Sequence, residues 1–218
     1  MKKIILAAAM LLLTISLSAQ KIGVLAGFNS TQISYENFDA SNIQSFHAGL
    51  TMSQPLALGF VIQPSLIYNV KGSINDITGL KGIVGTDLLG SVVSDMKTRV
   101  QYLEVPVQLQ WGIDLLLARP YLFAEPFVGY ALGGDYSYTL LSNAMEGKLD
   151  MDEMKSRLEY GFGLGAGVEV LGKIQLNLKY FWNFENPEGL SGYLDAVQNS
   201  VKDRSSFSGM ALSAVLFF

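Results

Sequence analysis

The chain has 218 residues, of which half are hydrophobic and only 16% are charged, and it contains 22 glycines and no cysteine. An ordinary soluble domain carries about 25% charged residues, yet no stretch after the first twenty positions is long and apolar enough to be a membrane-spanning helix. The composition thus excludes a helical membrane protein and any cysteine-based metal or disulfide site, and the formal charge of −4 gives no sign of a nucleic-acid partner.

The N-terminus has the pattern of a secretory signal peptide. Lys2 and Lys3 precede an apolar run over 4–15, and small residues then lead to Ala19. We predict cleavage after Ala19, so that residues 1–19 are the signal peptide and residues 20–218 form one exported domain. An uncleaved membrane anchor is the alternative, although the run is short for a span. Loss of the two lysines would change the formal charge from −4 to −6.

Apolar and polar residues alternate with a period of two through most of the remaining chain, which is typical of β-strands with two different faces. One face is apolar and free of charge, and the other carries charged residues and the single histidine. Eight strands are predicted, in chain order, at 21–29, 45–54, 57–69, 99–111, 120–132, 159–170, 173–184 and 207–218. The charged face holds Glu104, Glu125, Glu169, Lys173, Lys179 and His47.

Two observations indicate that lipid covers the apolar face. The connections alternate between long and short, as in an outer-membrane barrel with long extracellular loops and short periplasmic turns. Aromatic residues also end the apolar face, at Phe28, Phe46, Tyr68, Tyr130, Tyr160 and Trp182 beside the long loops and at Trp111 and Phe218 at the opposite rim. We therefore predict an all-β fold, an eight-stranded antiparallel up-and-down transmembrane β-barrel. A secreted β-sandwich is the alternative.

The block Tyr-Leu-Glu-Val-Pro-Val over 102–107 resembles the PorT type of outer-membrane barrel found in Bacteroidetes. The glycine-rich stretches at 23–29 and 161–167 and the segment 126–130 add to this resemblance. The resemblance implies an outer-membrane location, and the family's best-known members assist protein secretion. Phe218, with apolar residues at every second position before it, also resembles the C-terminal signal that barrel-assembly machinery recognises.

The inward face of the predicted strands indicates a filled lumen. Gly161, Gly163, Gly165 and Gly167 would face inward in succession, leaving room for the rings of Tyr121, Phe123, Phe127 and Phe181. An eight-stranded barrel is just wide enough for its interior to be filled by side chains. We expect Glu104, Glu125, Glu169, Lys173 and Lys179 to be paired or hydrogen-bonded inside, because an unpartnered buried charge is costly. A narrow polar conduit is the alternative.

Catalytic and binding motifs are weak. His47 has the inward parity, and the candidate nucleophiles Ser30, Ser45 and Ser65 lack a motif such as G-x-S-x-G. Asp150, Asp152 and Glu153 are more typical of a solvated loop than of a metal site, and the glycines of 82–90 lack the context of a phosphate loop. We predict no catalytic, cofactor-binding or metal-binding residues, no cofactor, and no enzymatic activity.

The long loops contain apolar residues at near-helical spacing. These are Ile83, Val84, Leu88, Leu89, Val92 and Val93 in the loop before residue 99, Leu141, Met145, Leu149, Met154 and Leu158 over 140–158, and Leu190, Leu194, Val197 and Val201 in the last loop. They would form short helices that cover the barrel mouth, or an exposed surface for a partner.

The leading functional hypothesis is a non-enzymatic outer-membrane protein that acts as a structural or interaction protein through its extracellular loops. An accessory role in protein secretion follows from the resemblance alone, and a lipid-modifying enzyme is an alternative of another class. The expected partners are outer-membrane lipid and lipopolysaccharide, the barrel-assembly machinery at the C-terminal strand, and a protein bound by the loops. No nucleic-acid partner is expected.

Overall fold

The computed structural model of the protein describes residues 20–34, 40–75, 93–140, 143–148, 157–185 and 206–218. The predicted signal peptide at 1–19 lies outside these ranges and stays a prediction. The described strands are β1 (Lys21–Ser34), β2 (Ala40–Ser41), β3 (Ile43–Pro55), β4 (Phe60–Asn75), β5 (Val93–Gly112), β6 (Ala118–Leu140), β7 (Asn143–Lys148), β8 (Leu158–Val170), β9 (Ile174–Glu185) and β10 (Ser206–Phe217). No helix in the described ranges is long and apolar enough to cross a bilayer.

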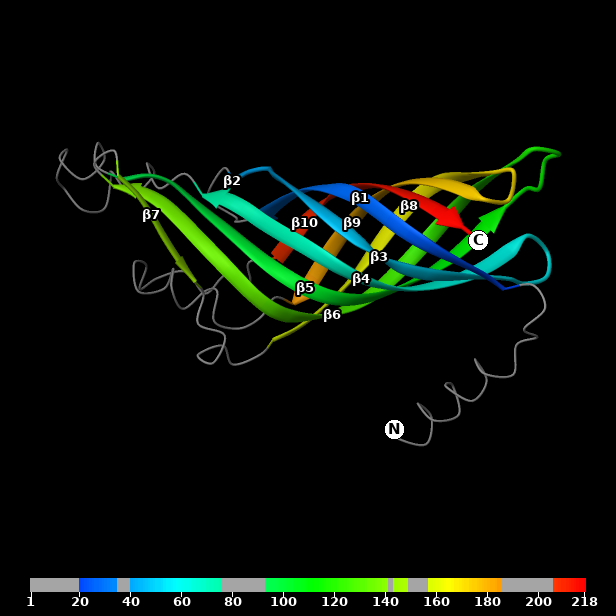
Figure 1. Cartoon of the computed structure of the whole chain (residues 1–218), viewed down its shortest axis with the longest axis horizontal. Coiled ribbons are helices and arrows are strands. Elements are labelled where there is room, and N and C mark those ends of the chain that lie inside the picture. The colour runs from blue at the N-terminus through cyan, green and yellow to red at the C-terminus, as the bar shows by residue number, and fades with distance from the viewer. Residues whose placement is uncertain (1–19, 35–39, 76–92, 141–142, 149–156, 186–205) are drawn as a thin grey trace, which may run out of the picture.

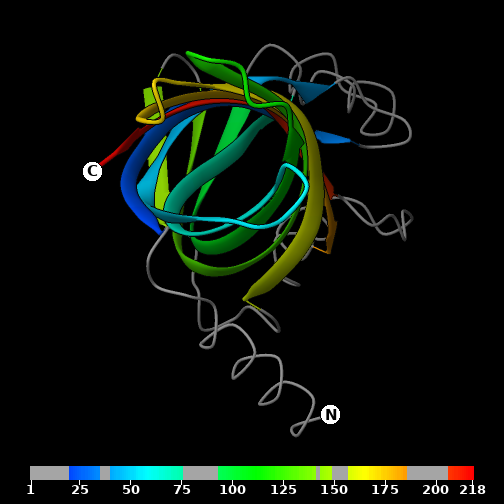
Figure 2. The ribbon, with the colours of Figure 1, turned by 90° about the vertical axis from the view of Figure 1, so that its right-hand side faces the viewer.

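Eight long strands close into a barrel, and each is antiparallel to both of its neighbours (Figures 1 and 2). Around the wall their order is β1, β3, β4, β5, β6, β8, β9 and β10, after which β10 pairs with β1 again. The two short strands lie outside this circle, with β2 beside β4 and β7 beside β6. The predicted eight-stranded antiparallel barrel is therefore confirmed.

The two faces of the wall differ as the alternation predicts. On β6, Leu122 is 62% exposed on the outer face, whereas the next residue, Phe123, is 4% exposed and points into the lumen. The aromatic residues predicted at both ends of the apolar face all point outward. Glutamates, asparagines and glutamines are buried instead, among them Glu104, Gln110 and Gln175. A protein with apolar residues outside and polar residues inside is suited to a hydrocarbon solvent.

Two of the short turns have the geometry of a type I′ hairpin. Leu58 and Gly59 have φ values of 62° and 80°, and Leu171 and Gly172 have φ values of 53° and 67°. The amide of Phe60 donates to the carbonyl of Ala57 across the first turn. Type I′ turns match the twist of paired strands and favour Asn, Asp or Gly at both central positions. A leucine with positive φ therefore costs about 1–2 kcal/mol.

The strands are longer than predicted at the long-loop end. β5 begins at Val93 rather than 99, and β6 continues to Leu140 rather than 132. Lys97 and Asp135 in these added lengths are charged and exposed, as is Arg99 at the predicted start of β5, so the apolar alternation stops there while the strands remain paired. The pairing of β5 with β6 also shifts by one residue between Gln101 and Tyr102, so that odd-numbered residues of β6 face outward beyond this point and even-numbered ones before it. Figure 1 shows β5, β6 and β7 extending past the rest of the barrel.

The helical prediction for 140–158 is wrong over Asn143–Lys148, which forms β7 and pairs with the end of β6. A hairpin satisfies the backbone groups of both segments, and the regular spacing of Leu141 and Met145 does not outweigh that pairing. The remaining apolar loop residues, from Ile83 to Val92, at Leu149 and Met154, and from Leu190 to Val201, lie outside the described residues.

The predicted packing of rings against glycines is confirmed for three of the four glycines, whereas the nearest side-chain atom to a Cβ on Gly163 is Cβ of Phe181 and not a ring atom. Gly161, Gly165 and Gly167 on β8 face the rings of Phe127, Phe123 and Tyr121, so that a Cβ on any of them would collide with its ring. On the lumen side of β8, the rings of Phe127 on β6 and Phe181 on β9 meet edge to face, with centroids 6.3 Å apart. The absent side chains of β8 therefore create the space that these aromatic side chains fill.

We predict that Gly165→Ala destabilises the barrel by about 1–3 kcal/mol, the usual penalty for overpacking a filled interior. The new methyl would collide with the carbonyl oxygen of Leu178 and with the ring of Phe123. Gly163→Ala is the matched control, since its methyl would lie 3.4 Å from the carbonyl oxygen of Tyr180 and 3.6 Å from Cβ of Phe181. The midpoint of heat-induced unfolding, followed by mobility on detergent gels, measures both. Equal midpoints for the two variants would contradict the prediction.

Candidate functional site: the polar lumen

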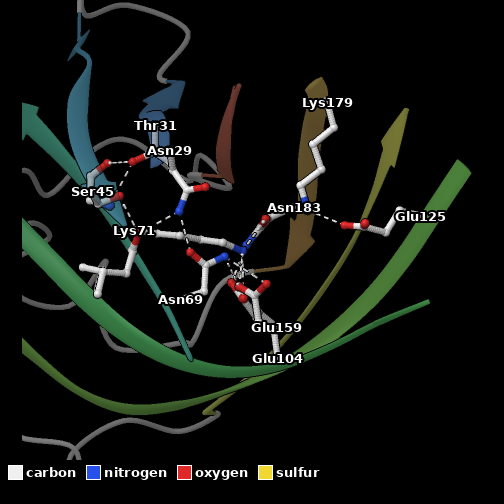
Figure 3. Close-up of polar contacts among 12 residues, drawn as sticks. Asn29, Thr31, Ser45, Asn69, Lys71, Glu104, Glu125, Glu159, Lys179 and Asn183 are labelled. Atoms are coloured by element: carbon white, nitrogen blue, oxygen red, sulfur yellow. Dashed lines mark hydrogen bonds and ion pairs between the residues drawn. The ribbon is translucent and has the colours of Figure 1, made fainter. Parts of the chain in front are cut away.

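A buried ammonium group with two carboxylate partners lies in the lumen near the long-loop end. Nζ of Lys71 on β4 is 2.7 Å from Oε1 of Glu104 on β5 and 2.9 Å from Oε1 of Glu159 on β8. Lys71 also donates to Oδ1 of Asn183 on β9, at 3.3 Å (Figure 3). The lysine and both glutamates are almost fully buried. These contacts join strands from opposite sides of the barrel.

Aromatic rings surround the same ammonium group. Nζ of Lys71 lies 4.5 Å from the ring centroid of Phe127, 5.1 Å from that of Phe181 and 5.3 Å from that of Tyr102. The negative faces of aromatic rings attract a cation within about 6 Å. Aromatic rings that pack beside the glycines of β8 therefore also help to offset the cost of removing the Lys71 ammonium group from water.

Amide side chains complete the cluster. Nδ2 of Asn69 donates to both carboxylate oxygens of Glu104, at 3.0 Å each, and its Oδ1 accepts a bond of 2.5 Å from Asn29 on β1. The amide of Asn183 donates to Glu159. Gly129 makes this possible, since a Cβ there would lie 2.6 Å from Oε1 of Glu159 and 2.9 Å from Cγ of Glu104. We call Lys71, Glu104, Glu159, Asn69 and Asn183 the lysine cluster.

A second group of polar side chains lies in the middle of the barrel. Glu125 on β6 forms an ion pair with Lys179 on β9 and accepts a 2.7 Å bond from Nε2 of Gln108. Beside it is a cavity of about 20 Å³, lined by Glu125, Lys179, Gln108, His47, Ser65 and Ser213 among others. A cavity needs about 10–15 Å³ to hold one water molecule, so this space suits a bound water rather than a solute.

Two further groups of polar contacts lie near the short turns. Glu169 on β8 pairs with Lys21 at 2.6 Å and accepts a 2.9 Å bond from Nε2 of Gln175. Arg119 donates to Oε1 of Gln110 at 3.0 Å and to the carbonyl of Gly59 at 2.8 Å. Thus all four interior glutamates of the described strands have a basic partner, as buried charges require.

The predicted interior charges are confirmed with one exception. Glu104, Glu125, Glu169 and Lys179 lie inside and are paired. The prediction for Lys173 is wrong. This residue is exposed in the turn between β8 and β9, because the chain reverses over residues 171–173 and β9 begins only at Ile174.

Lys71 and Glu159 were not among the predicted interior charges. Lys71 lies two residues beyond the predicted end of its strand at 69, although it keeps the inward parity of Asn69. Glu159 has the inward parity of Gly161 within a predicted strand. Following the inward-facing positions of each strand by two more residues, to the nearest charged side chain, would have identified both as interior charges.

His47 is buried in the lumen, as its parity predicts, and its Nε2 is 2.8 Å from the hydroxyl of Ser213. Its Nδ1 has no hydrogen-bond partner among the described residues. Two of the candidate nucleophiles bond elsewhere, Ser45 to the carbonyl of Val70 and Ser65 to Thr51. A serine–histidine pair that acts as a nucleophile and base also needs a third group to orient the histidine, and the described strands place none on Nδ1.

The described residues contain no group of three or more His, Asp or Glu side chains that could hold a metal ion. The acidic residues Asp150, Asp152 and Glu153 lie outside the described ranges.

We predict that Lys71→Met lowers the stability of the barrel by about 3–5 kcal/mol, because removal of one partner leaves buried carboxylates without compensation. Lys97→Met is the matched control, since Lys97 is exposed on β5. Urea unfolding of the barrel in lipid vesicles measures both. The triple variant Lys71→Met/Glu104→Gln/Glu159→Gln should regain much of the loss, and failure of Lys71→Met to differ from the control would refute the electrostatic role of the cluster.

Three solved barrels are similar in fold to this chain. Ail, the attachment invasion locus protein of Yersinia pestis, has 9% sequence identity and a TM-score of 0.43, with 91% of this chain and 98% of that chain covered. Neisserial surface protein A has 12% identity and a TM-score of 0.43, with coverages of 90% and 97%. The outer membrane enzyme PagL has 9% identity and a TM-score of 0.39, with coverages of 91% and 99%. No curated protein sequence matches the chain.

The family described as outer membrane protein beta-barrel domain matches residues 18–187, which is most of the chain. The finer resemblance to the PorT type stays a prediction. The closed antiparallel wall and its apolar outer face agree with the family match. The chain therefore belongs to the outer membrane protein beta-barrel domain family, whose place is the outer membrane.

Proposed function

We propose that this barrel is a non-enzymatic interaction protein that binds a partner at its extracellular end. The observation that carries the proposal is the unequal height of the wall. β6 continues eight residues beyond Leu132, the last exposed apolar residue on its outer face, and β5 begins ten residues before Leu103. In contrast, β8 begins only two residues before Tyr160. We call residues 93–101, 133–140 and β7 the outer extension.

The outer face of the extension is suited to a polar contact. Arg99 on β5 is directly opposite Asp135 on β6, which in turn is opposite Lys148 on β7. Asp135 accepts a 3.1 Å bond from Nε2 of Gln101, and Lys97 is exposed on the same side. Paired strands hold these charges at fixed spacing, whereas a loop would leave them variable. A rigid array of charges above the membrane supports recognition of a protein or of lipopolysaccharide.

The lumen supports a closed barrel rather than a pore. The lysine cluster and the pair of Glu125 and Lys179 occupy successive levels of the interior, and rings fill the space between them. Opening a path through the lumen would separate buried charges from their partners, which is strongly unfavourable. These contacts favour a role at the surface over solute transport.

An enzymatic role is disfavoured by the position of the histidine. His47 and Ser213 both point into the lumen, away from lipid acyl chains, and lie beside a cavity with room for about one water molecule. PagL is an enzyme with a similar fold, so lipid modification is the alternative that the experiment must address. An accessory role in secretion is implied by the PorT resemblance alone.

The test replaces residues 136–147 by Asn-Gly, a two-residue type I′ turn that joins the opposed residues Asp135 and Lys148. A photo-cross-linker at position 97 reports on the extension in intact cells. We expect a discrete cross-linked partner with the full-length chain, and a loss of roughly tenfold or more in the variant, equivalent to about 1.4 kcal/mol of binding free energy.

A cross-linker at position 111, on the lipid-facing side near the short turns, is the matched control and should give the same adducts in both chains. Heat-modified mobility verifies that the variant still folds. Unchanged cross-linking from position 97 would contradict the proposal. Steady single-channel openings in planar bilayers, or an altered acyl pattern of lipid A in a deletion strain, would support a channel or an enzyme instead.

A further inference from the structure

The end of the barrel with the short turns carries an apolar surface that the alternation of the strands does not explain. Its side chains belong to three turns and to the C-terminus: Leu58, Leu115, Leu116, Leu117, Leu171 and Phe218, which we call the short-turn rim. Leu116 is 98% exposed and Leu58 is 87% exposed, more than any residue on the apolar strand faces. Contiguous apolar surface of this kind marks a contact with another molecule or with a membrane.

Backbone hydrogen bonds connect the parts of the rim into one surface. The amide of Gly112 donates to the carbonyl of Gly59 at 3.1 Å and so links the first two turns. The amide of Leu171 donates to the carbonyl of Leu117 at 2.9 Å, which links the second turn to the third. The amide of Phe217 then donates to the carbonyl of Lys173 at 2.8 Å, beside the C-terminus. The leucines therefore follow one another around the barrel end.

The local backbone gives no reason for leucine in two of these turns. Leu58 and Leu171 occupy the first central position of type I′ turns with positive φ, where Asn, Asp or Gly is the favourable choice. Each is followed by a glycine that already supplies the second positive φ. A contact made by the leucine side chain explains its presence where the turn itself disfavours it.

The apolar part of several strands is too short for a membrane without the rim. On β4 the outward apolar face runs from Tyr68 to Phe60, and on β5 it runs from Leu103 to Trp111. Each of these faces covers eight residue-to-residue steps of about 3.3 Å, and strands tilted by about 40° from the membrane normal then cover a height of roughly 20 Å. The apolar band of outer-membrane barrels is about 25 Å tall, so the leucines of the turns supply the missing height.

We propose that the short-turn rim is embedded in the phospholipid acyl chains of the adjoining leaflet, instead of standing in water. This leaflet is the periplasmic one if the short turns face the periplasm, as in bacterial barrels. The rim is continuous with the lipid-facing surface of the strands, which favours lipid over a soluble protein as its occupant. Charge on the turns is limited to Asp114, which lies 3.5 Å from Nε of Arg119, and Lys173, which is exposed.

Hydrogen bonds within the turns reduce the penalty for leaving water. The amide of Leu56 donates to the carbonyl of Phe60 at 2.7 Å, and that of Leu115 donates to the carbonyl of Ala118 at 2.9 Å. Across the third turn, the amide of Lys173 donates to the carbonyl of Val170 at 3.1 Å. Backbone groups in hydrocarbon must be satisfied within the protein, so these bonds allow the turns to sit at the boundary of the acyl region.

The test uses the absence of native cysteine. The variants L116C, L178C and K148C, each labelled with a bimane fluorophore, are refolded into protein-free phosphatidylcholine vesicles whose acyl chains carry bromine at a shallow or a deep position. Leu178 lies in the middle of the apolar face of β9, and Lys148 is exposed on the outer extension. We expect shallow bromines to quench the label on L116C, deep bromines to quench that on L178C, and neither to quench that on K148C.

Quenching of L116C no stronger than that of K148C would show that the rim is in water and would overturn the proposal. The variant L58C repeats the measurement on another turn if L116C fails to fold. Protection of L116C from a water-soluble thiol reagent in native membranes, without quenching in vesicles, would identify a protein as the occupant and would also overturn it. Because the vesicles contain no other protein, the result is independent of any partner at the outer extension.

Discussion

A backbone N–H or C=O group that faces hydrocarbon has no water to bond, and the whole architecture depends on that constraint. Pairing of β10 with β1 and of β4 with β5 gives every barrel strand a neighbour on both sides. Once the wall is closed, successive residues face lipid and lumen in turn. The fold therefore needs an apolar residue at every second position, and it leaves the intervening positions free for polar side chains.

The lumen then has to accommodate those polar side chains away from bulk water. It does so with two kinds of packing. The glycines of β8 leave space for the rings of Tyr121, Phe123 and Phe127, so part of the interior resembles an ordinary core. Charged groups are placed between the rings, and each glutamate has a basic partner from another strand. Ion pairs across the lumen hold opposite sides of the wall together where no backbone bonds can.

The fold could be predicted from the sequence because lipid and lumen act on alternate residues. The parity that placed Leu122 outside and Phe123 inside also placed Glu104, Glu125 and Lys179 in the lumen correctly. The limits of the strands could not be predicted in the same way. Beyond Leu103 and Leu132 the outward residues Arg99 and Asp135 are charged, as suits water rather than lipid, and the apolar alternation no longer marks a strand.

The partners within the lumen were harder to foresee than the inward positions. Lys71 contacts Glu104 on the neighbouring strand but also Glu159 on β8, on the far side of the wall. That contact depends on the tilt and stagger of the strands around the barrel, which parity along one strand does not determine. The family match gives the location of the protein.

The inward residues of β8 also bear on how this strand finds its place in the wall. Between Glu159 and Glu169, glycine occupies every inward position. A strand with such a uniform face could slide by two residues along β9 and still present glycine to most of the rings, since a shift of two keeps the same face inward. The glutamates remove this ambiguity. A slide in either direction would move Glu159 away from Lys71 and Asn183, and at the same time Glu169 away from Lys21 and Gln175. The two ion pairs at the ends of the glycine run thus select one alignment of β8 among several that would pack almost equally well.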